Sequence, residues 1–157
     1  VGINSRLDTF QAAVLRVKLR RLSDAVHDRQ TNAARYTRLL KEANLVAADQ
    51  VVLPSVDKHA FHVWNQYSIR VGEGRRDALK AHLSERGIGS EIYYPVPMHQ
   101  QECFKYLKVD PSTMVETERA SREILNLPIF PSLTETEQHQ VVKAIKGFYA
   151  AGAKAAA

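Results

Sequence analysis

Apolar residues recur at helical spacing through the first third of the chain, from Phe10 to Leu40. Asp8 precedes this pattern and can cap the free backbone N–H groups of a helix that starts there. No proline interrupts residues 8–43, so the pattern predicts one long helix, or two helices joined by a bend near Asp28. A helix this long needs another surface to cover its apolar residues, which indicates that part of the structure lies outside this chain.

The spacing then changes to the alternation of a β-strand over residues 63–71. Residues 72–87 are predicted to form a turn and an amphipathic helix, in which Leu79 and Leu83 face inward and Gly87 ends the helix. A second strand is predicted over residues 88–94. This region therefore reads as a β-α-β unit.

The last third of the chain is predicted to be mainly helical. One or two helical turns are expected over residues 102–107, and a helix that runs into a short strand is expected over residues 114–130. Thr134 begins the final helix, and Glu137 follows three positions later in the arrangement of a capping box. The alanine-rich residues 151–157 have no inward face and are expected to be frayed.

These elements predict an α/β fold of the α+β type. Residues 1–45 form a long helical region, residues 46–150 form a small α/β domain, and residues 151–157 form an alanine-rich tail. The small domain is expected to contain a mostly antiparallel sheet with its helices packed on one face.

The composition fits a globular protein without a membrane segment or a metal site. The 157 residues are 45% hydrophobic and 25% charged, which suits a single domain with a buried core. No apolar run reaches the ~20 residues that span a bilayer, and the N-terminus lacks a signal-peptide pattern. The six histidines and one cysteine lack the spacing of metal ligands. The single Cys103 cannot form an internal disulfide, which favours a cytoplasmic location.

The net charge of +5 raises the question of a nucleic-acid partner. Much of this charge comes from basic residues spread along residues 16–41. Such a helix can bind phosphates, but solvated basic faces are more common, and a positive field also attracts small anionic substrates. The leucines and valines of the same helix count against a free nucleic-acid-binding surface.

The segment "GINSRLD", residues 2–8, has the composition of an anion site. Asn4 and Ser5 supply hydrogen-bonding groups just before a helix N-terminus, whose dipole favours negative charge, and Arg6 adds a cation. The same residues also fit plain loop and capping chemistry, and the sequence alone leaves both interpretations open.

The segment "YYPVPMH", residues 93–99, combines two tyrosines, two prolines and a histidine. Proline fixes φ and favours extended backbone before it, so this segment is predicted to be a stiff path that leaves a strand. Tyr93 and Tyr94 alternate across the strand, so one can pack inward while the other faces a groove. His99 can donate to a phosphate or carry a proton near neutral pH. A packed aromatic pair with a surface histidine is the alternative.

Several segments, taken in order, resemble the nucleotide-sugar aminotransferases of the DegT/DnrJ type. They are "GINSRLDTFQAAVL", "FHVWNQYSIRV", the Arg75–Arg76 helix start, "RGIGSEIYYPVPMHQQ", "ERASREILNLPIFPSLTETE" and "VVKAIKGFY". Members of this family are pyridoxal-phosphate (PLP) enzymes of the aspartate aminotransferase fold, or fold type I. The resemblance covers Gly2 to Tyr149 and implies the C-terminal part of a longer enzyme. In the family the lysine that binds the cofactor lies upstream, and no lysine here stands in the matching context.

The resemblance also implies a reaction and a set of site residues. The full-length enzyme is expected to act as a homodimer that transfers an amino group, typically from glutamate, to a keto-sugar linked to a nucleotide. The asparagine that matches Asn4 contacts the phosphate of the partner subunit's cofactor, and residues 1–45 lie between domains and against the partner. The positions near the substrate are matched by Arg6, Tyr93, Tyr94 and His99. Tyr93 stands where histidine is common in the family.

No catalytic residue is expected within this chain, and the chain alone is expected to be inactive. Two alternatives remain open. One is a regulatory relative that keeps the fold without the lysine, and the other is a basic module that binds nucleic acid through residues 16–41.

Overall fold

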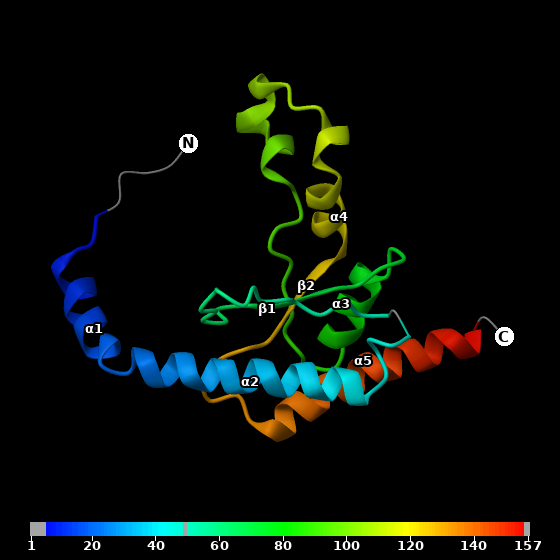
Figure 1. The fold of residues 1–157 in the computed structure, drawn as a ribbon, viewed down its shortest axis with the longest axis horizontal. Coiled ribbons are helices and arrows are strands. Elements are labelled where there is room, and N and C mark those ends of the chain that lie inside the picture. Colours follow the sequence, from blue (N-terminus) through cyan, green and yellow to red (C-terminus); the bar gives the residue numbers. More distant parts are fainter. Residues whose placement is uncertain (1–5, 49, 156–157) are drawn as a thin grey trace.

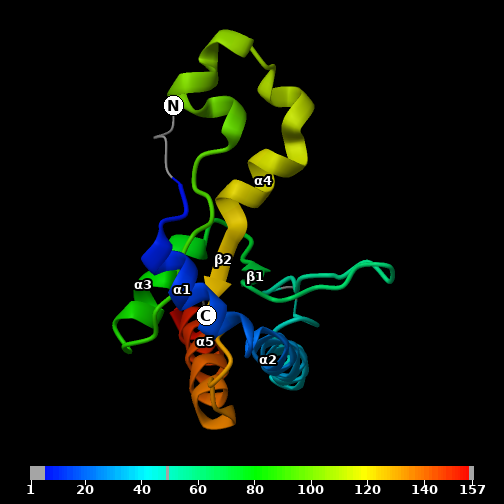
Figure 2. The ribbon, with the colours of Figure 1, turned by 90° about the vertical axis from the view of Figure 1, so that its left-hand side faces the viewer.

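The computed structural model describes residues 6–48 and 50–155 (Figures 1 and 2). The α-helices among them are α1 (Thr9–Leu19), α2 (Leu22–Glu42), α3 (Arg76–Ser84), α4 (Val115–Glu123) and α5 (Glu135–Ala155). Three short 3₁₀-helices, η1 (Met98–Gln100), η2 (Glu102–Leu107) and η3 (Pro111–Met114), precede α4, and the strands are β1 (Tyr67–Arg70) and β2 (Ile124–Leu127). This mixture of helices with a small antiparallel sheet confirms the predicted fold class.

The N-terminal helical region is divided into two helices. α1 is followed by its C-cap Arg20, and the Arg21 N–H donates to Lys18 O at 3.0 Å before α2 begins. The predicted bend near Asp28 is therefore wrong, because Asp28 lies within the continuous helix α2. The division separates a helix with no buried residue, α1, from one whose second half enters the core, α2.

β1 and β2 pair antiparallel at the centre of the molecule, with Ile69 opposite Leu125. The predicted strand over residues 63–71 is too long, because Trp64 adopts the left-handed backbone conformation (φ 50°) and interrupts the extended path before β1. The Trp64 N–H donates to the ring Nδ1 of His62 at 3.0 Å, so this irregular stretch has its own hydrogen bond.

The predicted strand over residues 88–94 is reduced to one antiparallel bridge, between Glu91 and Asn126. The Asn126 backbone N–H and side-chain Nδ2 both donate to Glu91 O, at 2.8 and 3.0 Å. Pro95 and Pro97 follow, and proline cannot donate to a sheet ladder. The segment therefore leaves the sheet soon after the bridge.

The hydrophobic core lies between the sheet and helices α2, α3 and α5 (Figure 1). Its fully buried aliphatic side chains include Leu40, Ile69, Leu79, Leu83, Leu125 and Ile145. Tyr36 is also fully buried, with its ring centroid 5.2 Å from that of Tyr67 and its hydroxyl donating to Pro128 O at 3.0 Å. Burial raises the pKa of Tyr67 to about 12. The aromatic pair ties α2 to the sheet.

Residues 98–123 form an arm that rises from the sheet (Figures 1 and 2). The arm consists of η1, η2, η3 and α4, and the predicted helical turns over residues 102–107 correspond to η2. Tyr106 is 74% exposed near its tip, and Cys103 is exposed as well. Residues 98 and 99 belong both to the start of the arm and to the end of the candidate tyrosine segment. The packing of the arm therefore determines how that segment is held.

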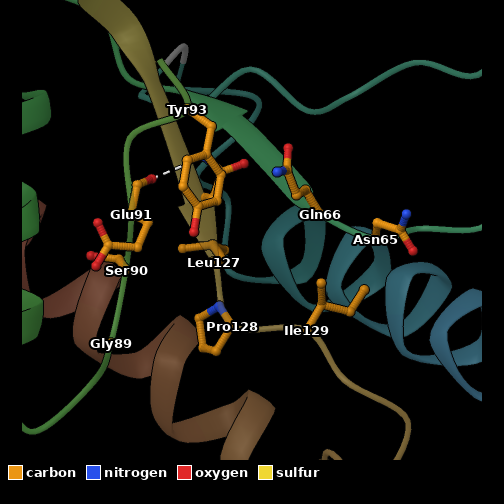
Figure 3. Close-up of a pocket in the computed structure, with 10 residues that line it drawn as sticks. Asn65, Gln66, Gly89, Ser90, Glu91, Tyr93, Leu127, Pro128 and Ile129 are labelled. Carbon is orange, nitrogen blue, oxygen red and sulfur yellow. Dashed lines mark hydrogen bonds between the residues drawn. The ribbon is translucent and has the colours of Figure 1, made fainter. Parts of the chain in front are cut away.

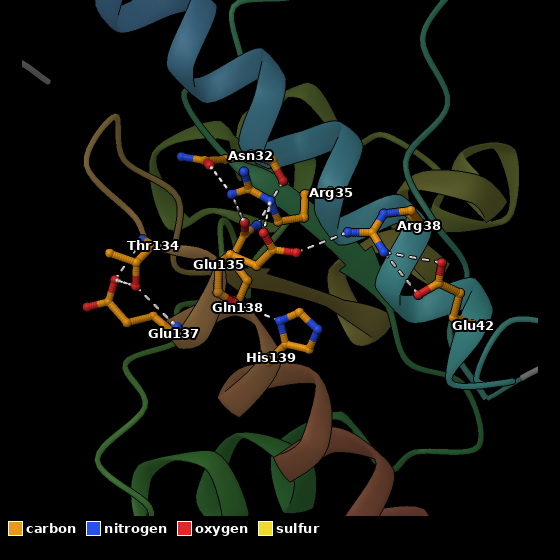
Figure 4. Close-up of polar contacts among 9 residues, drawn as sticks. All are labelled: Asn32, Arg35, Arg38, Glu42, Thr134, Glu135, Glu137, Gln138 and His139. Atoms are coloured by element: carbon orange, nitrogen blue, oxygen red, sulfur yellow. Dashed lines mark hydrogen bonds and ion pairs between the residues drawn. The ribbon is translucent and has the colours of Figure 1, made fainter.

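A cluster of polar side chains joins α2 to α5 (Figure 4). Arg35 Nη1 donates to Asn32 Oδ1 at 3.0 Å and to Gln138 Oε1 at 2.8 Å, and Gln138 Nε2 donates to Asn32 O at 2.8 Å. Gln138 and Asn32 are both buried, so these bonds satisfy groups that water does not reach. The cluster fixes the helical region onto the small domain.

Basic residues of α2 are engaged within the chain. Arg29 Nε donates to Val63 O at 3.0 Å. Arg38 lies 3.2 Å from carboxylate oxygens of both Glu42 and Glu135. Arg29 and Arg38 are therefore held by contacts within the chain, and the nucleic-acid alternative stays untested.

α5 begins with the predicted capping box. The Thr134 N–H and hydroxyl donate to Glu137 Oε2 at 2.8 and 2.7 Å, and the Glu137 N–H donates to Thr134 Oγ1 at 3.3 Å. The bonds from the Thr134 hydroxyl and backbone lower the pKa of Glu137 below its ordinary value. α5 then continues to Ala155, so residues 151–155 of the alanine-rich tail belong to a helix, and their fraying stays a prediction.

The capping box makes stability depend on pH. Because the folded state lowers the pKa of Glu137, its ionised form stabilises the protein above the unfolded-state value of 4.5, and this is lost as the pH falls through the folded-state pKa. We expect Glu137→Gln to lower the melting temperature at about pH 7 and to lower it less at about pH 3. Thermal unfolding of both proteins at both pH values measures this difference. An equal difference at the two pH values would contradict the assignment.

Candidate functional site

The tyrosine loop, residues 93–99, connects the Glu91 bridge to the arm. Tyr94 is 71% exposed and Tyr93 is 39% exposed, with their ring centroids 5.5 Å apart across a cis peptide bond. Tyr93 lies beside β2 and lines a cavity there (Figure 3). The loop therefore presents one tyrosine to solvent and places the other against the sheet.

His99, at the end of the loop, is held by a carboxylate. Its Nε2 lies 2.8 Å from Glu118 Oε1, and the two side chains are only 9% and 16% exposed. Gln100 Nε2 donates to the same oxygen at 2.6 Å, and Arg122 Nη1 lies 3.5 Å from Glu118 Oε2. Glu118 on α4 thus anchors the end of the tyrosine loop to the arm.

A group that donates to a substrate needs a free and accessible nitrogen. The surroundings of His99 differ from this expectation. Its Nε2 already has a partner, and its ring is mostly covered. Sequence reasoning did not find Glu118. Glu116 and Glu123 lie on the same helix, and nothing in the local sequence distinguishes Glu118 from them.

The sheet-edge cavity, of about 220 Å³, lies beside Tyr93 (Figure 3). Its other polar lining residues are Asn65, Gln66, Ser90, Glu91 and Asn126. Its apolar floor comes from the end of β2 and the residues after it, Leu127, Pro128 and Ile129. Of all these residues the sequence marked only Tyr93 as a site candidate, because the cavity is assembled from three segments far apart in the chain.

Ser90 is one of the residues that line this cavity, and its side chain carries an unsatisfied hydroxyl. It is buried and has no hydrogen-bond partner among the described residues, an arrangement that costs about 1–3 kcal/mol. Its neighbours are satisfied: Asn126 accepts from the Ser68 hydroxyl and donates to Glu91 O. Lys80 Nζ donates to Ser90 O at 2.7 Å and lies 3.5 Å from Glu91 Oε2.

A second cavity, of about 210 Å³, lies between the tyrosine loop and α4. Its lining is mainly apolar and includes Tyr94, Val96, Pro97, Met98, Ala120 and Ile124. Tyr94 and Met98 are 71% and 64% exposed, so this cavity continues into an open apolar surface. Such a surface suits a further segment of protein or the apolar part of a ligand.

The predicted N-terminal site is only partly described. Asn4 lies outside the described residues, and its predicted contact stays a prediction. Arg6 is exposed just before α1, which begins as predicted with Asp8 Oδ1 accepting from the Gln11 N–H at 2.8 Å. The contacts of the described chain include none between Arg6 and the tyrosine loop.

The described residues do not by themselves fit PLP. The two cavities beside the tyrosine loop are lined by no lysine or arginine in this part of the chain, so neither offers a cation to a cofactor phosphate. Lys80, which contacts two residues of the sheet-edge cavity, already bonds to Ser90 O. We therefore derive no catalytic step from this chain.

The described residues contain neither a metal-binding cluster nor a helix that could span a membrane. No group of three or more His, Cys, Asp and Glu side chains is arranged to hold a metal ion there. None of the helices in residues 6–48 and 50–155 has the length and apolar character needed to cross a bilayer.

Comparison with protein families matches residues 1–146 to the DegT/DnrJ/EryC1/StrS aminotransferase family. A pleiotropic regulatory protein of Geobacillus stearothermophilus is 44% identical over 149 residues, which cover 95% of this chain and 39% of that protein. A dTDP-3-amino-3,6-dideoxy-alpha-D-galactopyranose transaminase of Aneurinibacillus thermoaerophilus is 34% identical over 147 residues, which cover 94% and 38%. The chain thus spans less than two fifths of the length of either relative.

Solved structures show the same relationship. A DegT DnrJ EryC1 StrS aminotransferase from Brucella abortus superposes with a TM-score of 0.79 at 41% identity, covering 94% of this chain and 37% of that one. NtdA of Bacillus subtilis, solved with bound cofactor PMP, superposes with a TM-score of 0.78 at 31% identity, covering 94% and 33%. The small domain and its helical region therefore recur as one part of larger proteins.

Proposed function

Because the chain belongs to the DegT/DnrJ/EryC1/StrS aminotransferase family, we propose that it is the C-terminal part of a PLP-dependent aminotransferase. The full-length protein transfers an amino group, typically from glutamate, to a keto-sugar linked to a nucleotide. The observation that carries this proposal is the family match over residues 1–146. A transaminase of a dTDP-linked sugar among the relatives supports the choice of substrate class.

In this proposal the tyrosine loop forms part of the wall of the substrate site. Tyr94 contacts the substrate, which is supported by its 71% exposure, and Tyr93 lies deeper against the sheet. Arg6 contacts an anionic group of the ligand. His99 and Glu118 act as positioning residues, because their mutual contact holds the loop in place.

The helical region faces a second copy of the protein in this proposal. Asn4 contacts the phosphate of the partner subunit's cofactor, as its position in the family motif suggests. Phe10 and Val17 of α1 are 87% and 65% exposed, and an apolar helix face of this kind is what a homodimer interface covers.

The remaining parts of the site come from outside this chain. PLP, when bound, serves as the electron sink for amino-group transfer. The lysine that binds it and the large domain that holds it lie in the part of the protein that this chain does not span. The chain alone is therefore inactive in this proposal.

The test compares the full-length protein with the 157-residue chain. With PLP, glutamate and a panel of dTDP- and UDP-linked keto-sugars, the full-length protein is expected to form 2-oxoglutarate and an amino sugar. The chain alone is expected to form neither, and to give no lysine-dependent absorbance band with PLP. Transfer by the chain alone, or such a band, would contradict the proposed division of the site.

A regulatory role is the second candidate, because a 44% identical relative is named a pleiotropic regulatory protein. A regulatory relative keeps the fold and binds its ligand without transferring an amino group. The same assay separates the two functions. Binding of a nucleotide sugar by the full-length protein, without 2-oxoglutarate from any sugar in the panel, would favour regulation.

A further inference from the structure

Helices α3 and α5 pack side by side (Figure 1) and border a third cavity, of about 470 Å³, the α3–α5 cavity. Its α5 side consists of residues that share one face of the helix, namely Gln140, Lys143, Ala144, Gly147 and Ala151. Its other side consists of His82, Arg86 and Ile88. None of these residues lines the two cavities beside the tyrosine loop. The volume lies within the roughly 300–1,000 Å³ of small-molecule sites.

The lining of the α3–α5 cavity is positively charged. It contains the exposed cations Arg86 and Lys143 and, among the described residues, no aspartate or glutamate. No described residue forms an ion pair with Lys143. Glu85 lies 3.7 Å from Arg86 Nη1, but a pair as exposed as this one contributes little. Two cations beside one cavity repel each other, and an anion between them relieves that repulsion.

The donors around the cavity suit a phosphate group. Arg86 Nη1 donates to His82 O at 2.9 Å, which positions the guanidinium and uses only one of its N–H donors. Lys143 and the amide of Gln140 lie one turn apart on α5 and add further donors. A phosphate carries more charge than a carboxylate and has three acceptor oxygens, so it can bond to all three side chains at once.

The walls of the cavity are fixed by contacts between the two helices. His82 Nε2 lies 3.0 Å from Ala144 O, and because a carbonyl only accepts, the imidazole donates this bond. The His82 ring also packs edge-on against Phe148, with ring centroids 5.3 Å apart. Leu83 of α3 and Ile145 of α5 are fully buried. The cavity is therefore already formed in the free protein, which lowers the cost of binding.

Gly147 keeps part of this cavity open. Glycine destabilises the interior of a helix relative to alanine, and Gly147 lies well within α5. A Cβ atom at this position would meet no heavy atom within 4 Å, so no contact in the described chain requires a glycine. Gly152 of the same helix differs, because a Cβ there would meet the guanidinium of Arg75. The space above Gly147 is thus left free by a residue choice that the helix itself does not favour.

We propose that the α3–α5 cavity binds a small molecule that carries a phosphate or diphosphate group. Arg86 and Lys143 pair with the phosphate oxygens from opposite sides of the cavity, and Gln140 donates a further hydrogen bond. The rest of the molecule lies over Gly147 and Ala151. This inference does not depend on the proposed function.

Protection of Lys143 from acetylation in the full-length protein tests this proposal. The protein is treated with N-hydroxysuccinimidyl acetate in pyrophosphate, in AMP, or in sodium chloride of equal ionic strength, and each lysine is quantified by mass spectrometry. Pyrophosphate and AMP are each expected to slow the labelling of Lys143 severalfold relative to sodium chloride. Lys146, an exposed lysine of the same helix outside the cavity lining, is the internal control and is expected to keep its rate.

Three outcomes of this labelling experiment overturn the proposal. One is unchanged labelling of Lys143 in millimolar pyrophosphate, and another is equal slowing at Lys143 and Lys146. The third is protection by pyrophosphate without protection by AMP, which would mean that the cavity takes a free anion only. The labelling requires no amino-group transfer, so its result is separate from the test of the aminotransferase.

Arg86→Gln tests the second cation, with the Kd for pyrophosphate read from the protection of Lys143. This variant is expected to raise the Kd about 10-fold, as the loss of one charge-assisted hydrogen bond predicts. Arg119→Gln removes an exposed arginine that pairs with Glu116 on α4, and as the matched control it is expected to leave the Kd unchanged. Equal Kd values for the two variants overturn the proposal.

Gly147→Leu fills the cavity without removing any contact of the protein. Its melting temperature is expected not to fall, because leucine favours the helix more than glycine does and the position is open. Protection of Lys143 by AMP is expected to be lost, while Gly147→Ala, which adds a single methyl group, is expected to weaken it less. A lower melting temperature, or unchanged protection in Gly147→Leu, overturns the proposal.

Discussion

Replacing Glu118 with alanine is expected to lower kcat/KM of the full-length protein for its nucleotide sugar about 100-fold, because a displacement on the order of 1 Å in a site can cost that much. Glu118 binds His99, the last residue of the tyrosine loop, at 2.8 Å, and Gln100, which follows the loop, at 2.6 Å. Without the carboxylate, His99 remains mostly buried with no partner for its Nε2, and the loop loses its anchor. Steady-state kinetics measure the effect.

Two variants serve as controls for this prediction. Arg119 lies on the same helix as Glu118 but pairs with Glu116 and not with the tyrosine loop. Arg119→Ala is therefore expected to leave kcat/KM near the wild-type value. Glu118→Gln keeps an acceptor for His99 and is expected to lose less activity than Glu118→Ala. A near-normal kcat/KM for Glu118→Ala would show that the loop does not depend on this anchor.

Tyr36→Ala is expected to lower the free energy of unfolding of the domain by about 3–5 kcal/mol, the range found when a buried aromatic residue is replaced by alanine. Tyr36 is fully buried, packs on Tyr67 and bonds to Pro128 O, so its removal leaves a cavity where α2 meets the sheet. Hydrogen exchange of the amides in α2 and β1 measures this loss within the full-length protein.

Tyr36→Phe separates the contribution of the hydroxyl to stability from that of the ring. It leaves Pro128 O without its donor and is expected to cost about 1–3 kcal/mol, less than the alanine variant. Tyr106→Ala is the matched control, because Tyr106 is 74% exposed and surface substitutions usually change stability by no more than about 0.5 kcal/mol. Similar exchange rates for Tyr36→Ala and Tyr106→Ala would refute the central place of Tyr36.

The sequence predicts the helices best where local signals decide their ends. Thr134 and Glu137 form the predicted capping box, and Gly87 (φ 70°) ends α3 as its position suggests. The strand prediction failed where a non-local arrangement decides the backbone. Trp64 takes a left-handed conformation directly after His62 and Val63, whose carbonyls accept bonds from Gln30 and Arg29 of α2, and alternation along the chain does not encode these contacts.

The candidate site was predictable only in part, for the same reason. The prolines marked the tyrosine loop as stiff, because a single residue type fixes its own backbone angle. Glu118 lies 19 positions from His99, and the pairing follows from how the arm folds back. The unpartnered state of Ser90 likewise depends on burial by distant segments, a property that the residue type does not carry.

The apolar side chains along α1 affect how this polypeptide can be produced by itself. Leu7, Phe10 and Val14 are 63%, 87% and 59% exposed, and a contiguous apolar face of this kind promotes aggregation in water. The chain alone is therefore expected to self-associate as its concentration rises, so assays on it need dilute solutions. A shortened chain that begins at Leu22 lacks this face and is the more suitable source of material for crystallisation and NMR.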